Sequence, residues 1–165
     1  MSIVSIASLL YRLVTAGLLG AQLFFAAVAA QVVFSREIAA RPPGDPLRQQ
    51  AADAVGGMLA RLDAATLSGA AIAVVCSVLL ARNGIPGARG AALFPLLAGL
   101  CAAASAFLVT PAIHALRVAG RTGDPAFGRL HALSAGLLLL EMIFLLVAAI
   151  RAPSPAALFP RAPSL

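Results

Sequence analysis

Glu141 is the residue whose type and position best suit it to chemistry, because it is the one acid in the apolar stretch of residues 127–150. A charged carboxylate near the centre of a bilayer costs several kcal/mol and must face other helices or water. His131 and Ser134 precede it by ten and seven residues, so at about 100° per residue the three side chains share a helix sector roughly 80° wide. The spacing predicts a polar stripe from His131 near the surface to Glu141, about 15 Å deeper.

Two interpretations of this stripe are open. In the functional one, His131, Ser134 and Glu141 form a path for protons or cations, or a ligand pocket. In the structural one, Glu141 is a protonated acid that hydrogen-bonds a neighbour such as Gln22 or Gln31.

His114 and His131 lie on either side of one short connection and are expected near one membrane face. Two imidazoles at one level could bind haem or copper. No further ligands surround them in the sequence, so both are weak metal candidates, the expectation is no metal site, and no cofactor is assigned.

Arg61 and Asp63 are charged residues near the expected start of the second apolar stretch, and we expect a structural ion pair at the membrane surface there. Cys76 and Cys101 have no motif spacing and are expected to be small apolar fillers. The chain has no phosphate loop, no nucleophile–base pair, no zinc-protease motif and no carboxylate dyad in sequence, so we expect no enzymatic activity.

The composition indicates the elements that must position these residues. The 165 residues are 61% hydrophobic and 11% charged, whereas soluble domains carry about 45–50% apolar and about 25% charged residues. The net charge of +6 comes from arginines that flank apolar runs, which marks contact with the lipid bilayer surface and argues against nucleic acid as a partner. Arginine and alanine without lysine suggest a bacterial genome, so the expected location is the bacterial inner membrane.

A membrane-spanning helix needs about 20 apolar residues, and four stretches qualify. The sequence therefore predicts an all-α integral membrane four-helix bundle. The expected single membrane domain covers residues 1–151, with a proline-rich tail at 152–165. For residues 46–53, a short interfacial helix that leads into the second span and a non-helical connection are both open. The first apolar stretch could alternatively contain a cleaved signal peptide. The expected spans are residues 5–34, 57–81, 91–116 and 127–150.

Small residues recur every four positions in the second and third spans, which predicts that these two helices pack closely as a hairpin. Arginines number five on the face of the termini and seven on the other face, so the first and third loops lean towards the cytoplasm. The two stripes are Ala65, Gly69, Ala73 and Ser77, and Ala98, Ala102, Ala106 and Thr110.

Four segments resemble the transmembrane protein 205-like family, known in bacteria as domain of unknown function 4149. They are residues 19–25 (LGAQLFF), 54–59 (AVGGML), 110–117 (TPAIHALR) and 127–134 (FGRLHALS). The resemblance implies a four-helix membrane protein. Animal members of this family are associated with platinum-drug tolerance, and the family is similar in general to membrane domains of copper-resistance proteins. The family-like positions are Pro111, Arg117, Phe127, His131 and Ser134.

Pro111 is predicted to end or kink the third span, and His131 to hydrogen-bond the backbone group that this proline frees. The first functional hypothesis is a small transporter or accessory protein for a cation, metal or small ligand. The alternatives are a structural or assembly subunit of a larger membrane complex and a haem-binding membrane protein. Whether the chain forms a homo-oligomer is left open.

Overall fold

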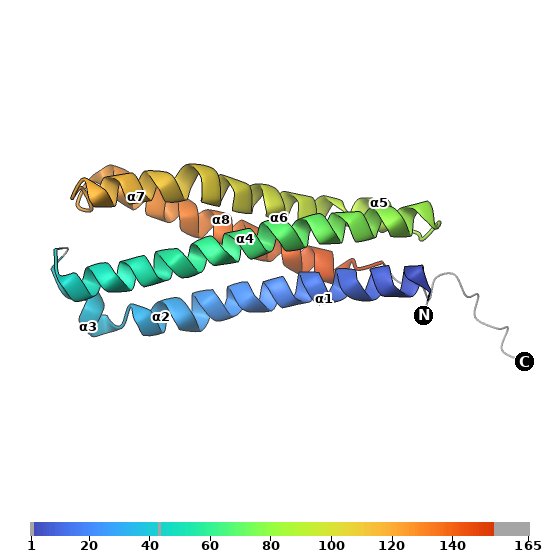
Figure 1. Ribbon diagram of the computed structural model, residues 1–165, viewed down its shortest axis with the longest axis horizontal. Coiled ribbons are helices and arrows are strands. Elements are labelled where there is room, and N and C mark those ends of the chain that lie inside the picture. Colours follow the sequence, from blue (N-terminus) through green and yellow to red (C-terminus); the bar gives the residue numbers. More distant parts are fainter. Residues whose placement is uncertain (1, 43, 154–165) are drawn as a thin grey trace, which may run out of the picture.

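The computed structural model describes residues 2–42 and 44–153 of this chain, and over these residues it is an all-α bundle without strands. Four long helical segments run side by side, with the N-terminus and α5 at one end and α3 and α7 at the other (Figure 1). The helices are α1 (Ile3–Phe24), α2 (Ala30–Val33), α3 (Arg36–Ala39), α4 (Pro46–Arg82), α5 (Ala88–Ala91), α6 (Leu93–Ala104), α7 (Thr110–Val118) and α8 (Pro125–Ile150). Two π-helical turns, η1 (Phe25–Ala29) and η2 (Ser105–Val109), join α1 to α2 and α6 to α7.

Four segments are long and apolar enough to cross a membrane, so the chain is a multi-pass membrane protein. Both described ends lie on one side of the bundle, where the Ser8 hydroxyl donates to the carbonyl oxygen of Pro153 at 2.9 Å. Of the expected tail at 152–165, residues 154–165 lie outside the described part. The four segments are Ile3–Val33, Pro46–Arg82, Ala88–Val118 and Pro125–Ile150.

The second span begins earlier than the sequence suggested, because α4 is one continuous helix of 37 residues. Asp45 caps it by accepting hydrogen bonds from the backbone N–H groups of Leu47 (2.9 Å) and Arg48 (3.3 Å). Pro46 occupies the first turn, where its missing N–H costs nothing. Residues 46–53 are therefore the first turns of α4 rather than a separate interfacial helix.

The residues of α4 that contact neighbouring helices most closely are only partly those of the small-residue stripe predicted from the sequence. Ala65 is exposed, and Gly69 faces α1 instead of α6: a Cβ added at Gly69 would lie 2.6 Å from Leu18 Cδ1. The approach of α4 to α6 is made by Ala70, whose Cβ lies 3.0 Å from the Cβ position of Gly99. The stripe was wrong at Ala65 and Gly69, because four-residue spacing drifts around a helix of 3.6 residues per turn. The predicted hairpin itself is confirmed, since α4 packs against α6 and the stripe residues Ala73, Ser77, Ala98 and Ala102 are buried.

Tyr11 anchors the core at the end of the termini. Its hydroxyl is within hydrogen-bonding distance of the carbonyl oxygens of Ala91 (2.9 Å) and Ala148 (3.3 Å), and the side chain is fully buried. Most of the residues around it are small, which lets the helices approach closely. This cluster also contains Ala7, Ala73, Cys76, Leu80, Ile85 and Ala88.

Pro111 neither ends nor sharply divides the third span, because α7 continues to Val118. Proline has no N–H to donate, so the helix must rearrange in the preceding turn. The turn η2 makes this adjustment, and the N–H of Thr110 donates to the carbonyl oxygen of Ser105, five residues back. The expected kink is thus a π-helical turn that widens the helix next to the proline.

Asp124 is the N-cap residue of α8, and replacing it tests how much its carboxylate stabilises the first turn of this helix. Its carboxylate accepts a 2.8 Å hydrogen bond from the N–H of Ala126, and this bond together with the Arg121 guanidinium holds the pKa of Asp124 below its ordinary value. A lowered pKa in the folded state means that this contribution to stability is present above about pH 4 and is lost as pH falls through the folded-state value. We expect Asp124→Ala to speed amide exchange at Ala126 near neutral pH, as measured by hydrogen–deuterium exchange.

The difference between Asp124→Ala and the unmodified chain should disappear in acid, when each pair is compared at the same pH. Glu37→Ala is the control, because the Glu37 side chain lies in the separate helix α3 and is exposed. An acceleration that persists unchanged in acid would show that the Asp124 carboxylate does not stabilise the first turn of α8.

Candidate functional site

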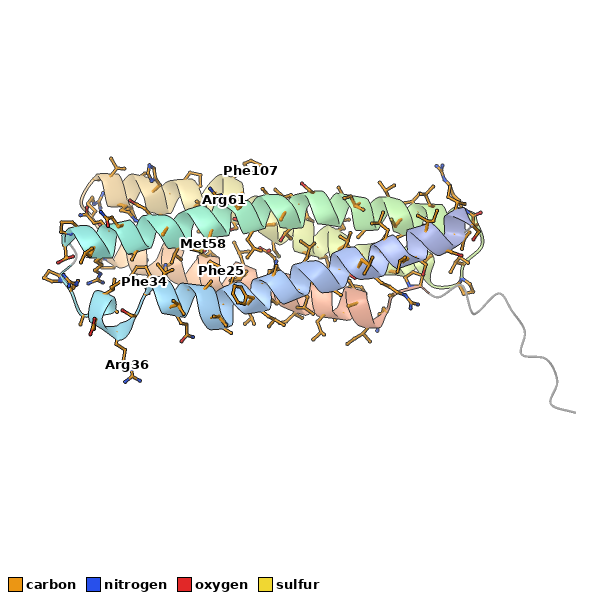
Figure 2. All side chains as sticks on the ribbon, turned by 60° about the horizontal axis from the view of Figure 1, so that its bottom comes forward. Phe25, Phe34, Arg36, Met58, Arg61 and Phe107 are labelled. Carbon is orange, nitrogen blue, oxygen red and sulfur yellow. The ribbon has the colours of Figure 1, made fainter. Side chains whose placement is uncertain are left out.

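A cavity of about 850 Å³ opens at the end of the bundle that carries α3 and α7. Its walls come from the first turns of α4, from α7, from the start of α8 and from Phe34. Figure 2 labels Phe34 at this end of the bundle. This volume lies in the range of small-ligand pockets, about 300–1,000 Å³. The residues that line the cavity include Phe34, Arg48, Asp53, Leu59, Thr110 and Arg117.

The cavity brings together residues that the sequence singled out separately. His114 and Pro111 come from α7 and Phe127, His131 and Ser134 from α8, and Arg117 joins them. The rings of Phe127 and His131 are stacked, with centroids 6.3 Å apart and planes 6° from parallel. Both histidines are exposed at the cavity rim, whereas Ser134 is buried deeper on α8.

The predicted hydrogen bond from His131 to the backbone near Pro111 is absent from the described residues, so that expectation was wrong. The turn η2 already satisfies the backbone at this point, since Thr110 bonds to Ser105. The His131 ring is held instead by its stack on Phe127, one turn earlier on the same helix.

Among the charged residues that line the cavity, positive side chains outnumber negative ones. Arg117 Nη1 lies 3.0 Å from Asp53 Oδ1, an ion pair between α7 and α4. Arg48 forms no ion pair with any described residue, and its guanidinium donates to the backbone carbonyl oxygen of Arg41. Two guanidinium groups thus face one carboxylate, which leaves the wall with an excess positive charge.

Glu141 does not line this cavity and lies deeper in the bundle. It is 1% exposed, and its Oε2 accepts a 2.8 Å hydrogen bond from Gln22 Nε2 of α1. Of the two neighbours considered from the sequence, Gln22 makes this contact, while Gln31 is exposed. The three residues of the predicted stripe therefore do not share one site. His131 and Ser134 line the cavity, and Glu141 lies in the interior of the bundle.

Asp63 is also buried, at 1% exposure, and does not pair with Arg61 at the surface. Its Oδ2 accepts a 2.8 Å hydrogen bond from the hydroxyl of Ser105 in η2, whereas Arg61 is exposed. The expected ion pair was wrong for two reasons. Residues two apart point to nearly opposite sides of a helix, and α4 begins at Pro46, which places Asp63 about 25 Å from its start.

The buried acids belong to a polar network that sequence reasoning missed. Gln22 Nε2 also donates to Thr66 Oγ1 at 3.0 Å, and Thr66 lies one turn after Asp63 on α4. Gln22 thus links Thr66 of α4 to Glu141 of α8, which brings the carboxyl groups of Asp63 and Glu141 into one network. The chain therefore has a carboxyl pair formed across helices, which the spacing of residues within one helix cannot reveal.

Three oxygens of this network are buried without a hydrogen-bond partner among the described residues: Gln22 Oε1, Asp63 Oδ1 and Glu141 Oε1. Each charged acid placed at the centre of a spanning helix costs about 2.5–3.5 kcal/mol on insertion scales. Among the residues that the structure describes, no group of three or more His, Cys, Asp or Glu side chains is arranged to hold a metal ion.

The two polar sites are thus an open cavity with excess positive charge and an interior network with two carboxyl groups. Comparisons of the chain with models of known families, with curated proteins and with solved structures give no match.

Proposed function

We propose that this membrane protein binds a small amphipathic anion in the cavity, as a transporter or accessory protein for that ligand. The observation that supports this proposal is the combination of a cavity of about 850 Å³ with a wall guanidinium, Arg48, that forms no ion pair within the described part of the chain. A cation is disfavoured as the ligand, because two arginines outnumber one acid there.

The apolar share of the wall favours a ligand with a hydrocarbon part. Phe34, Leu59 and Phe127 contribute carbon surface, while Arg48 and Arg117 are placed to bind an anionic headgroup. Guanidinium groups bind phosphate and carboxylate through paired, charge-assisted hydrogen bonds. An alkyl phosphate has both features and serves as the probe.

The binding test uses an introduced tryptophan as a fluorescent reporter, which has no background from other tryptophans. The chain contains no tryptophan, so Phe34→Trp places a single indole in the cavity wall. In nanodiscs of phosphatidylcholine, dodecyl phosphate is expected to change this fluorescence saturably. Arg48→Gln in the same background should weaken binding about tenfold, which corresponds to about 1.4 kcal/mol.

Two further variants separate specific binding from general attraction to the surface. Asp53→Asn should tighten binding severalfold, because Arg117 loses its ion-pair partner and becomes available to the ligand. Arg36→Gln should leave binding unchanged, since Arg36 projects from α3 away from the bundle at the same end (Figure 2). Equal losses in Arg36→Gln and Arg48→Gln would contradict a cavity site.

We further propose the bacterial inner membrane as the location, with the first and third loops on the cytoplasmic side. The cavity then opens to the cytoplasm, because Phe34, Arg48 and Thr122 of its wall lie at or near these loops. In this orientation, the ligand would enter the cavity from the cytoplasmic leaflet of the membrane or from the cytoplasmic solution.

A structural subunit is the second candidate, and one observation favours it. Glu141 is bonded to Gln22 outside the cavity, as expected for an acid that fixes helix packing. A partner that copurifies in stoichiometric amount, together with failure of dodecyl phosphate to bind, would replace the ligand-binding proposal with this one.

A further inference from the structure

All four membrane-crossing segments contribute to the interior polar network around Glu141. α1 supplies Gln22, α4 supplies Asp63 and Thr66, the third span supplies Cys101 and Ser105, and α8 supplies Glu141. Gln22, Asp63, Thr66, Ser105 and Glu141 are each at most 2% exposed. The hydrogen-bond donors to the two carboxyl groups are an amide and a hydroxyl, and no arginine or histidine among the described residues bonds to either.

The hydrogen bonds of this network leave acceptor atoms, but no donor atoms, without partners among the described residues. The three unpartnered atoms, Gln22 Oε1, Asp63 Oδ1 and Glu141 Oε1, are all oxygens that accept hydrogen bonds. An ionised carboxyl group has acceptors only, whereas a protonated one gains an O–H that donates. Protonation of one acid therefore supplies a donor for another buried oxygen and removes a charge from the low-dielectric interior.

The network lies directly below the cavity. Leu59 of the cavity wall precedes Asp63 by one turn, about 6 Å along α4, and Ser134 precedes Glu141 by about 10 Å along α8. Between the two sites, Thr110 lines the cavity and has a buried hydroxyl oxygen without a partner among the described residues. The hydroxyl groups of Thr110 and Ser134 thus lie in the cavity wall, on the helical segments that continue to Ser105 and Glu141.

We propose that Asp63 and Glu141 form an intramembrane proton-binding site that exchanges protons, through the cavity, with the solution at the cavity mouth. A proton from solvent forms an O–H bond on one carboxylate oxygen, and its release restores the carboxylate. The site is independent of the ligand proposed above, so failure of dodecyl phosphate to bind leaves it standing.

The groups that face the two acids limit how the site titrates. Cys101 of α6 is the titratable neighbour of Glu141 besides Asp63, while α1 contributes the neutral amide of Gln22 and η2 the hydroxyl of Ser105. The charged groups of α7 and of the early part of α4 that line the cavity are Arg117, Arg48 and Asp53. The two carboxyl groups should therefore titrate as a coupled pair.

Infrared difference spectroscopy tests the site in phosphatidylcholine nanodiscs, because protonated carboxyl groups in an apolar setting have a distinct C=O stretch. We expect the unmodified protein to gain this band between alkaline and acidic pH, and Glu141→Gln to remove part of it. In Asp63→Asn, the midpoint of the remaining band should move to lower pH, because a neighbouring negative charge is gone.

The controls keep the proposal falsifiable if a variant fails to fold. Glu37→Gln replaces an exposed acid of α3 and should leave the band unchanged. In the unmodified protein alone, the absence of any pH-dependent buried carboxyl band would overturn the proposal. A midpoint that depends on sodium concentration would also overturn it, by assigning the carboxyl pair to a metal cation.

Discussion

Gly69→Leu should lower the free energy of unfolding in detergent by about 1–3 kcal/mol, because α1 and α4 touch at this glycine. Even a Cβ there would meet Leu18 Cδ1 at 2.6 Å and Val14 Cγ1 at 3.0 Å. Leu18 has a flexible side chain that can shift, but Val14 is β-branched and stiff in a helix. The remaining atoms of a leucine would therefore force the two helices apart.

Gly136→Leu is the matched control for this prediction. Gly136 also lies inside a spanning helix, α8, but it is exposed, and an added Cβ meets nothing within 4 Å. It should unfold at nearly the same temperature as the unmodified protein, since glycine to leucine also favours the helix. If the two variants lost equal stability, the close approach of α1 and α4 at Gly69 would be refuted.

Gln22→Leu should lower the free energy of unfolding by about 1–2 kcal/mol, because it strands two buried polar groups at once. The Gln22 amide donates to Glu141 Oε2 at 2.8 Å and to Thr66 Oγ1 at 3.0 Å. Hydrogen bonds between membrane helices average about 0.6 kcal/mol, so most of the loss comes from desolvated groups left without a donor. Thermal or denaturant unfolding in detergent measures it.

The double variant Gln22→Leu/Glu141→Leu sharpens this test. When both partners of a buried hydrogen bond become apolar, the cost falls close to zero, so the double variant should be more stable than Gln22→Leu alone. Gln31→Leu is the control, since Gln31 is exposed and should tolerate leucine. A double variant that is less stable than Gln22→Leu would mean that Glu141 has stabilising partners other than Gln22.

Most of the architecture could be read from the sequence because hydropathy is a local property. Each span needs only about 20 neighbouring apolar residues, and the breakers between spans are local too: Gly84, Gly87 and Gly120 adopt positive φ in the three-dimensional structure. The boundary of α4 was missed because helix-forming residues from Pro46 onwards continue the span beyond its apolar part.

The candidate site was only partly predictable. His114, Pro111, Arg117, Phe127 and His131 cluster in sequence on both sides of one short connection, so their meeting at one cavity follows from an antiparallel pair of helices. Asp53 and Arg48, in contrast, come from the early turns of α4, far away in the chain. Their arrival at the same cavity depends on how α4 packs against α7.

The sequence by itself determined that this protein crosses a membrane four times and that Glu141 is an acid within the fourth span. Only the tertiary structure decided that Gln22 rather than Gln31 contacts it, and that Asp63 faces inward beside Ser105. Gln22 and Gln31 are nine residues apart, half a turn out of phase on a regular α-helix. The π-helical turn η1 between them changes that angle, so spacing alone does not say which of them faces Glu141. Which one does so depends on the rotation of each helix against its neighbours, which is set by contacts such as Gly69 with Leu18 between residues distant in the chain.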